Sequence, residues 1–120
     1  LLERLRQAGV RTAVVSNKPD RTTRTLAARF FPELDGAMGQ REGIASKPAP
    51  DMVRAALDQL HAAPEETLYV GDSEVDVATA RNAGLDMIGV AWGFRGRAAL
   101  EAAGAPLVAD TPEQLLDMLQ

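Results

Sequence analysis

The sequence predicts an α/β protein with a doubly wound parallel sheet, in which helices cover both faces of the strands. Two observations indicate this fold class. Short apolar segments with the composition of buried strands alternate with segments whose apolar residues have helical spacing, and the 120 residues contain no repeat or low-complexity stretch. Strands that alternate with helices form parallel sheets that are buried on both faces. This chain length suits one small domain with a single core.

The first half of the chain is expected to form two strands and the helices around them. Residues 1–9 have the pattern of the last turns of an amphipathic helix closed by glycine. The segment 10–16 is an apolar strand bounded by turn residues at 17–20, after which Asp20 or Thr22 is expected to cap a helix. The remaining expected elements are that helix, with apolar residues at 26, 27, 30 and 31 and a stop at Pro32, a short strand at 35–40, a loop at 41–50 and a helix at 51–62.

The second half continues the alternation of strands and helices. Its most apolar segments, 67–71 and 87–92, are expected to be buried strands. A helix at 74–83 closed by Gly84 lies between them, and a Gly-rich turn at 93–96 follows the second strand. The expected elements that complete the chain are a helix at 97–103, a short strand at 106–109 and a final helix with Pro112 at its first position.

The composition argues against several classes of partner. The formal net charge of −4 disfavours nucleic acid, because phosphates attract basic surfaces. No apolar run approaches the roughly 18 residues that span a bilayer, and the first residues show no signal-peptide pattern, so we expect no membrane partner. The chain has no cysteine, which excludes disulfides and thiolate chemistry and fits a cytoplasmic location.

A pair of carboxylates follows the expected strand at 67–71. Asp72 and Asp76 lie where the next helix begins, and carboxylates are oxygen ligands suited to Mg²⁺. The carboxyl end of a strand is also where open α/β sheets bind ligands. A structural interpretation competes with the metal site, because Ser73 and Asp76 have capping-box spacing and acidic residues stabilise the first turn of a helix. Residues farther upstream favour the metal site.

These upstream residues are Ser16, Asn17 and Lys47. Ser16 and Asn17 stand where the first strand ends, and Lys47 lies in the loop that leads to a later helix. Because loops after parallel strands converge on one edge of a sheet, we expect these groups to meet the carboxylate pair. A hydroxyl, an amide and an ammonium suit a phosphoryl group, which needs hydrogen-bond donors and neutralising charge. Taken singly, the first two residues could simply end a strand, and the lysine could be a solvated loop residue.

In this order the motifs resemble those of the haloacid dehalogenase (HAD) superfamily of phosphohydrolases, and more narrowly its phosphoglycolate-phosphatase-like members. Three family motifs are a strand ending in Ser or Thr, a Lys often followed by Pro, and Gly-Asp followed by a second acid. The matching segments are Val14-Val15-Ser16-Asn17, Lys47-Pro48 and Gly71-Asp72-Ser73-Glu74-Val75-Asp76. The segments 80–84, 89–94, 103–105 and 110–115 also resemble this subgroup, so the similarity covers essentially the whole chain.

The resemblance implies a HAD-like, Rossmann-like core and a Mg²⁺-dependent hydrolase of small phosphomonoesters that works through an aspartyl-phosphate. By this resemblance, Ser16 would hydrogen-bond the transferred phosphoryl group, Asn17 would assist there, and Lys47 would offset its charge. Asp72 would hold Mg²⁺ directly, and Asp76 would ligate it or orient its waters. The expected partner is therefore a small phosphorylated metabolite.

The sequence departs from the family pattern at the first motif. That motif, Asp-x-Asp, provides the nucleophile and the general acid/base, and none of the nine aspartates of this chain belongs to such a pair. The cap domain that selects the substrate in these relatives is missing as well, and Leu1 falls inside an expected helix. We therefore expect residues 1–120 to be the carboxyl-terminal part of a HAD-like core without its first strand and cap. Without the nucleophile, we expect no phosphatase turnover from this chain alone.

Other interpretations stay open. A non-catalytic phosphate- or metal-binding module derived from the same fold would also lack the nucleophile. A receiver-like or nucleotide-binding α/β domain is a further alternative, although the chain has no G-x-x-x-x-G-K-[ST] phosphate loop. For the phosphatase, the resemblance of residues 92–94 favours 2-phosphoglycolate, but relatives that act on sugar phosphates or pyrophosphate share the core motifs.

Overall fold

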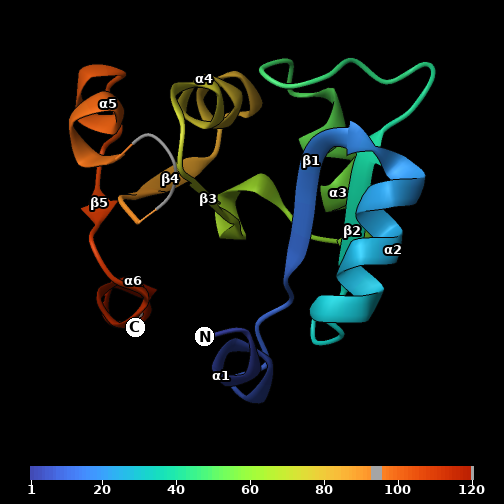
Figure 1. The fold of residues 1–120 in the computed structure, drawn as a ribbon, viewed down its shortest axis with the longest axis horizontal. Helices are drawn as coiled ribbons and strands as arrows, with labels where there is room; N and C mark the ends of the chain where they lie inside the picture. Colours follow the sequence, from blue (N-terminus) through green and yellow to red (C-terminus); the bar gives the residue numbers. More distant parts are fainter. Residues whose placement is uncertain (93–95, 120) are drawn as a thin grey trace. The chain divides into compact units, whose positions relative to one another are not determined.

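The computed structural model of the chain describes residues 1–92 and 96–119. Within this part of the chain, the strands form two parallel sheets, one in the order β1-β2 and one in the order β3-β4-β5 (Figure 1). The chain divides into two compact units, Leu1–Ala62 and Ala63–Gln120, and each contains one of the sheets. We call these the first and the second unit. The α/β class with parallel strands is as predicted.

Every helix and strand expected from the sequence is present, several of them with shifted boundaries. The first unit contains α1 (Leu2–Gln7), β1 (Ala13–Pro19), α2 (Asp20–Phe30), β2 (Gly36–Gln40) and α3 (Asp51–Leu60). The second unit contains the 3₁₀ helix η1 (Pro64–Glu66), β3 (Leu68–Gly71), α4 (Glu74–Ala83), β4 (Asp86–Val90), α5 (Gly96–Ala102), β5 (Val108–Ala109) and α6 (Pro112–Leu119). Most of the expected Gly-rich turn, residues 93–95, lies outside the described residues. Among the described helices, none has the length and apolar character needed to cross a membrane.

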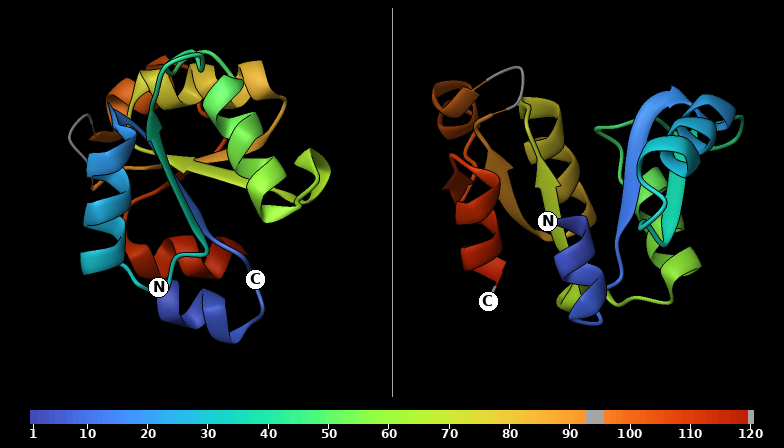
Figure 2. Two further views of the ribbon diagram at one scale, coloured as in Figure 1. Left: turned by 90° about the vertical axis from the view of Figure 1, so that its right-hand side faces the viewer. Right: turned by 60° about the horizontal axis from the view of Figure 1, so that its bottom comes forward.

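In the first unit, two helices cover a two-stranded parallel sheet. β1 pairs with β2, with Val15 opposite Met38, and Figure 2 shows α2 and α3 on opposite sides of these strands. The helical spacing of the apolar residues of α3 turns one face of that helix towards the sheet. The buried apolar residues of the unit are Ala27, Met38, Met52, Val53, Ala56 and Leu57.

The junction between β1 and α2 differs from the prediction. The expected turn at 17–20 is largely strand, because β1 continues to Pro19 and α2 follows directly. Neither Asp20 nor Thr22 caps the helix, which has Pro19 at its N-cap and no side-chain capping bond. The carboxylate of Asp20 is used elsewhere: it accepts hydrogen bonds from the Gly39 amide at 2.9 Å and from Arg24 Nε at 2.7 Å.

The apolar face of α2 is less buried than its spacing indicated. Only Ala27 of the expected apolar residues is buried, whereas Leu26 and Phe30 are 39% and 59% exposed. A sheet of two strands covers only part of the helix. The Arg29 guanidinium instead lies over the ring of Phe30 in a cation–π contact, with Arg29 Cζ 5.3 Å from the centre of the ring.

The second unit is doubly wound. Successive residues of a strand point to opposite faces, and accordingly Met87 and Ile88 of β4 belong to two different apolar clusters. One cluster contains Val77 of α4 and Leu100 of α5, and the other contains Leu115 of α6. Helices α4 and α5 therefore cover one face of the β3-β4-β5 sheet, and α6 covers the other, as the predicted fold class requires.

Candidate functional site

The residues expected to bind phosphate in the first unit lie at the end of β1 and in the loop between β2 and α3. The side chain of Asn17 joins these two segments. Its Nδ2 donates to the Lys47 carbonyl oxygen at 3.3 Å, and its Oδ1 accepts from the Lys47 amide at 2.9 Å. Two hydrogen bonds in opposite directions hold the backbone of Lys47 against β1. The structure therefore brings Asn17 and Lys47 together through the backbone of the lysine, a link that the sequence analysis did not specify.

Ser16 precedes Asn17 on β1. Its Oγ accepts a hydrogen bond from the Lys18 amide at 3.1 Å. A hydroxyl that accepts through its oxygen can still donate its own proton. The side chain of Ser16 is therefore suited to donate to an oxygen of a phosphoryl group.

Asp20, the first residue of α2, and Gly39 of β2 join the ends of β1 and β2. The Gly39 amide donates to Asp20, and this hydrogen bond, with a smaller contribution from Arg24, holds the pKa of the Asp20 carboxyl below its ordinary value. A Cβ at position 39 would lie 2.5 Å from Thr23 Oγ1 and 2.7 Å from Asp20 Cα, so only glycine fits. From the sequence, Asp20 was expected only to cap its helix, and this link to Gly39 was not predicted.

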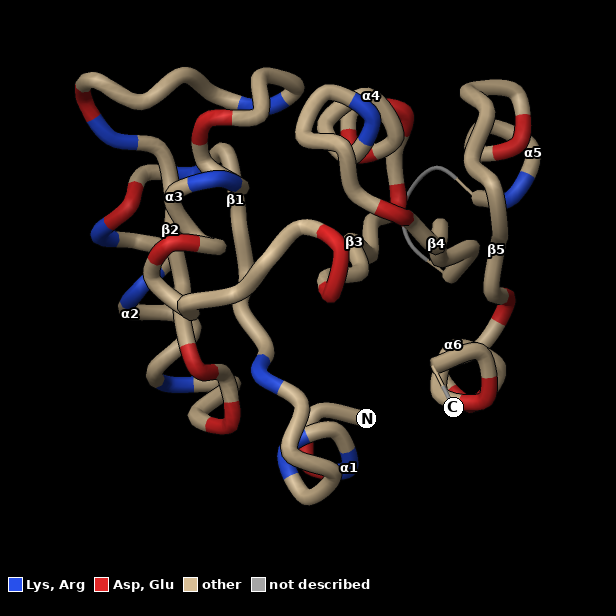
Figure 3. Tube along the Cα trace, turned by 180° about the vertical axis from the view of Figure 1, so that it is seen from behind, with Lys and Arg blue, Asp and Glu red and all other residues tan. Residues whose placement is uncertain are grey.

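In the second unit, the carboxylate of Asp76 is the centre of a hydrogen-bond network. Figure 3 shows acidic residues where β3 leads into α4. Asp76 is 6% exposed and lies in the first turn of α4. Its Oδ1 accepts from the Tyr69 hydroxyl at 2.8 Å. Its Oδ2 accepts from the Asp72 amide and from Ser73 Oγ, both at 3.1 Å. Three donors stabilise the buried negative charge and link Asp76 to the loop that carries Asp72.

The capping interpretation of Ser73 and Asp76 is confirmed. Ser73 is the N-cap of α4, and its Oγ accepts from the Asp76 amide at 3.3 Å. In return, the Asp76 carboxylate accepts from the amide of Asp72, one residue before the cap. The cap and the Asp76 carboxylate together hold the loop in which Asp72 lies.

Tyr69 is a site residue that the sequence analysis missed. It lies on β3 and packs against the buried cluster that includes Val77 of α4. Burial raises the pKa of the Tyr69 hydroxyl, and the nearby charge of Asp76 raises it further, so the hydroxyl remains a donor at neutral pH. One signal was available in the sequence: a tyrosine within an apolar strand needs a partner for its hydroxyl.

Of the acidic pair, Asp72 is the carboxylate better suited to hold Mg²⁺ directly, because both oxygens of the buried Asp76 accept hydrogen bonds. Within residues 1–92 and 96–119, no three His, Cys, Asp or Glu side chains cluster as a metal site. Asp72 and Asp76 are two carboxylates in one loop and the first helical turn after it. Mg²⁺ is commonly held by one or two carboxylates, with water and substrate phosphate oxygens as the remaining ligands. Such a site suits a phosphate-dependent reaction better than a permanent structural ion.

The other predicted relations are not tested by the structure. Ser16, Asn17 and Lys47 belong to the first unit and Asp72 and Asp76 to the second, so the convergence of the two groups stays a prediction. In the segment that favoured 2-phosphoglycolate, Trp92 is 46% exposed, and residues 93 and 94 lie outside the described residues.

The family of the chain is shown by comparison with known proteins. Residues 1–84 match the model of the haloacid dehalogenase-like hydrolases, and the chain belongs to this family. Within the family it is phosphoglycolate phosphatase-like. It is 32% identical, over 98% of its length, to the phosphoglycolate phosphatase of Vibrio vulnificus (strain YJ016), of which it covers 53%. It is 44% identical, over 61% of its length, to the pyrophosphatase PpaX of Bacillus mycoides (strain KBAB4), of which it covers 34%.

A solved structure agrees with this assignment. The chain superposes with a TM-score of 0.95 on the crystal structure of a candidate phosphoglycolate phosphatase from Lactobacillus delbrueckii subsp. bulgaricus, with 43% sequence identity. The match covers 98% of this chain and 50% of that protein. The chain thus spans about half the length of this neighbour and between 34% and 53% of the two curated relatives.

Proposed function

We propose that this chain provides the phosphate-binding and Mg²⁺-binding residues of a phosphatase that hydrolyses small phosphomonoesters, with 2-phosphoglycolate as the favoured substrate. The observation that carries the proposal is the pair of hydrogen bonds between Asn17 and the backbone of Lys47, which fixes the motif lysine beside the strand end that bears Ser16. Membership of a hydrolase family supports the reaction class. Similarity to a phosphoglycolate phosphatase supports the substrate, and similarity to a pyrophosphatase makes pyrophosphate its competitor.

In this proposal each side chain acts on the phosphoryl group or on its metal. Ser16 donates a hydrogen bond to a phosphoryl oxygen, and the ammonium of Lys47 offsets the charge that develops in the transition state. Asn17 assists by holding Lys47 in place. Asp72 holds Mg²⁺ directly, and Asp76 ligates it or orients its waters. When bound, the ion supplies a second positive charge against the same phosphoryl group.

The nucleophile of the proposed reaction comes from outside residues 1–120. None of the nine aspartates of the chain belongs to an Asp-x-Asp pair. In the proposed complete enzyme, a preceding segment provides this pair on the first strand, followed by the cap domain, and the cysteine-free chain works in the cytoplasm. A non-catalytic module that binds phosphate or Mg²⁺ is the alternative that the missing nucleophile favours.

The proposal is tested in a longer protein that contains this chain together with the aspartyl nucleophile. Asp72→Ala is expected to abolish Mg²⁺-dependent phosphate release. Lys47→Ala is expected to lower kcat/KM by roughly 100- to 1,000-fold, the scale of losing one preorganised charge. Arg41→Ala removes a different cation from the same loop and is the matched control, with little expected change in kcat/KM.

The outcomes separate the candidate functions. Near-normal turnover by the Asp72→Ala protein would show that the metal site lies elsewhere. Binding of phosphate and Mg²⁺ without turnover on any of several phosphomonoesters would favour the non-catalytic module. Comparison of kcat/KM for 2-phosphoglycolate and pyrophosphate decides between the two substrates.

A further inference from the structure

We propose that Tyr69 is a positioning residue of the candidate metal site. Its hydroxyl holds the carboxylate of Asp76, and Asp76 in turn holds the loop that presents Asp72. This inference rests on the proposed function, because it takes Asp72 as a ligand of Mg²⁺. The family motif covers the two acids, and Tyr69 lies before it in the sequence.

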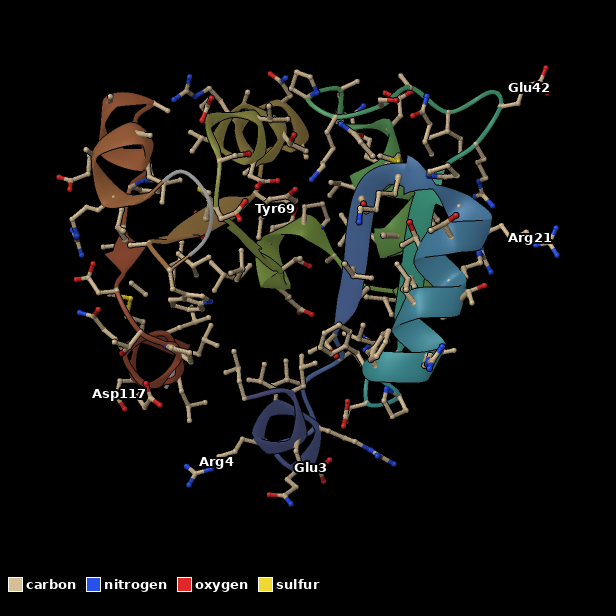
Figure 4. All side chains as sticks on the ribbon, viewed as in Figure 1. Glu3, Arg4, Arg21, Glu42, Tyr69 and Asp117 are labelled. Atoms are coloured by element: carbon tan, nitrogen blue, oxygen red, sulfur yellow. The ribbon has the colours of Figure 1, made fainter. Side chains whose placement is uncertain are left out.

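Packing against the core of the second unit anchors Tyr69 itself. The residue lies on β3, towards α4 (Figure 4), and packs against the buried cluster containing Val77 and Ala80. A ring packed in this way has little freedom to turn. Its hydroxyl is therefore a fixed donor, 2.8 Å from Asp76 Oδ1.

Asp76 links Tyr69 to the loop that carries Asp72. A carboxylate is a planar group, so a donor that fixes Oδ1 also fixes Oδ2 on the other side. Oδ2 accepts from the Asp72 amide and from Ser73 Oγ. A chain of hydrogen bonds thus runs from the Tyr69 ring through Asp76 to the backbone of Asp72.

The Asp76 carboxylate has no space to move towards β3. A Cβ on Gly71 would lie 2.5 Å from Asp76 Cγ and 2.7 Å from Asp76 Oδ2, so the backbone of β3 is pressed against this carboxylate. The carboxylate can turn about its own bond, but it cannot shift towards the strand. We therefore expect loss of the Tyr69 donor to ease this rotation and so to weaken the hydrogen bond from the Asp72 amide to Oδ2.

The expected consequence is a weaker metal site in a chain that still folds. Groups that hydrogen-bond the surroundings of metal ligands typically change metal affinity by about 10- to 100-fold when they are removed. We expect Tyr69→Phe, which deletes only the hydroxyl, to lower the Mg²⁺ affinity of the longer protein that contains this chain and the aspartyl nucleophile by about 10-fold or more.

The experiment measures the Mg²⁺ affinity of this longer protein by isothermal titration calorimetry, with Mn²⁺ binding followed by electron paramagnetic resonance as a second readout. Thr67→Val is the matched control: it removes a hydroxyl that donates to the Ala63 carbonyl at 2.7 Å, in the segment just before β3. Urea unfolding without metal gives the stability of each variant. Ser73→Ala removes another donor to the same carboxylate and tests the same link if Tyr69→Phe does not fold.

Weaker Mg²⁺ binding by Tyr69→Phe, with wild-type affinity in Thr67→Val, supports the inference. Unchanged affinity in Tyr69→Phe, with binding lost in Asp72→Asn, overturns it and leaves the proposed metal site intact. A lower unfolding midpoint with unchanged metal affinity also overturns it, because that result indicates a purely structural tyrosine. Absence of Mg²⁺ binding by the wild-type longer protein overturns both this inference and the proposed metal site.

Discussion

At position 71, any side chain would collide with the first turn of α4. The hydrogen-bonded carboxylate of Asp76 occupies the space in which a Cβ would lie. The glycine before Asp72 is therefore required by packing, and this packing also places Asp76 close enough to accept from the Asp72 amide. One residue without a side chain thus allows the loop and the helix to share a carboxylate.

We expect Gly71→Ala to lower the free energy of unfolding by about 1–3 kcal/mol, because the added methyl forces β3 and α4 apart. Urea unfolding followed by circular dichroism measures this change. Gly36→Ala is the control, since its Cβ would meet the flexible side chain of Gln59 at 3.3 Å. Equal stability of Gly71→Ala and the wild type would show that the approach is looser than the structure indicates.

Among the helices, α5 contributes a single buried side chain to the core of the second unit. Leu100 is 0% exposed and is the only buried residue of that helix. It packs onto β4 where Gly89 leaves space, since a Cβ there would lie 3.1 Å from Leu100 Cδ1. The sheet thus holds α5 through this apolar contact and through Arg97, whose Nη2 donates to the Val108 carbonyl of β5 at 3.1 Å.

Leu100→Ala is expected to destabilise the second unit by about 2–5 kcal/mol, through lost burial and the cavity left behind. Leu107→Ala removes the same atoms from a side chain that is 54% exposed and should change stability by about 0.5 kcal/mol or less. Chemical denaturation of both variants checks the difference. Similar effects from the two substitutions would contradict the packing of α5.

The link between β1 and β2 through Asp20 makes stability depend on pH. The hydrogen bond from Gly39 and the contact with Arg24 hold the pKa of Asp20 below its ordinary value of 3.8. A carboxyl whose pKa is lowered by folding contributes stability that is present above its unfolded pKa. This contribution is lost as the pH falls through the lower folded pKa.

We therefore expect Asp20→Asn to be less stable than the wild type at neutral pH and to approach it below about pH 3.8, since the wild type loses this contribution in acid. Urea midpoints measured from about pH 6 to about pH 2.5 test the expectation. Asp58→Asn, at an exposed carboxylate of α3, is the control. A constant difference between Asp20→Asn and the wild type over this range would contradict the role of Asp20.

For the whole molecule, the proposed enzyme needs more than this chain contains. Within their own sheets, β1 and β3 are each hydrogen-bonded to a strand on one side, β2 and β4 respectively. The chain spans about half of its structural neighbour. Our proposal assigns the missing first strand, with its nucleophile, to a preceding segment.

The 120-residue chain alone is expected to release no phosphate from 2-phosphoglycolate or pyrophosphate in the presence of Mg²⁺. Covalent catalysis has no first step without a nucleophile. A colorimetric assay of inorganic phosphate, with a buffer blank and a longer active relative as the positive control, measures the rate. Mg²⁺-dependent release well above the blank would refute this prediction.

The sequence by itself determined those features whose signals are local. Alternating apolar strands and amphipathic helices indicated the α/β class. Ser73 before α4 and Gly84 after it gave that helix its observed bounds, because caps act on neighbouring backbone groups. The order of the motifs indicated the family, which the comparisons then showed.

Only the tertiary structure decided which distant groups meet. Asp20 was expected to cap its own helix, but its partner is Gly39, 19 residues away. Asn17 is bonded to the backbone of a residue 30 positions later. Helical spacing could not reveal that Leu26 would stay exposed, because spacing records the direction of a side chain and not the width of the sheet beneath it. Such pairings depend on how separate segments pack, and many donors and acceptors in the chain are equally able to form them.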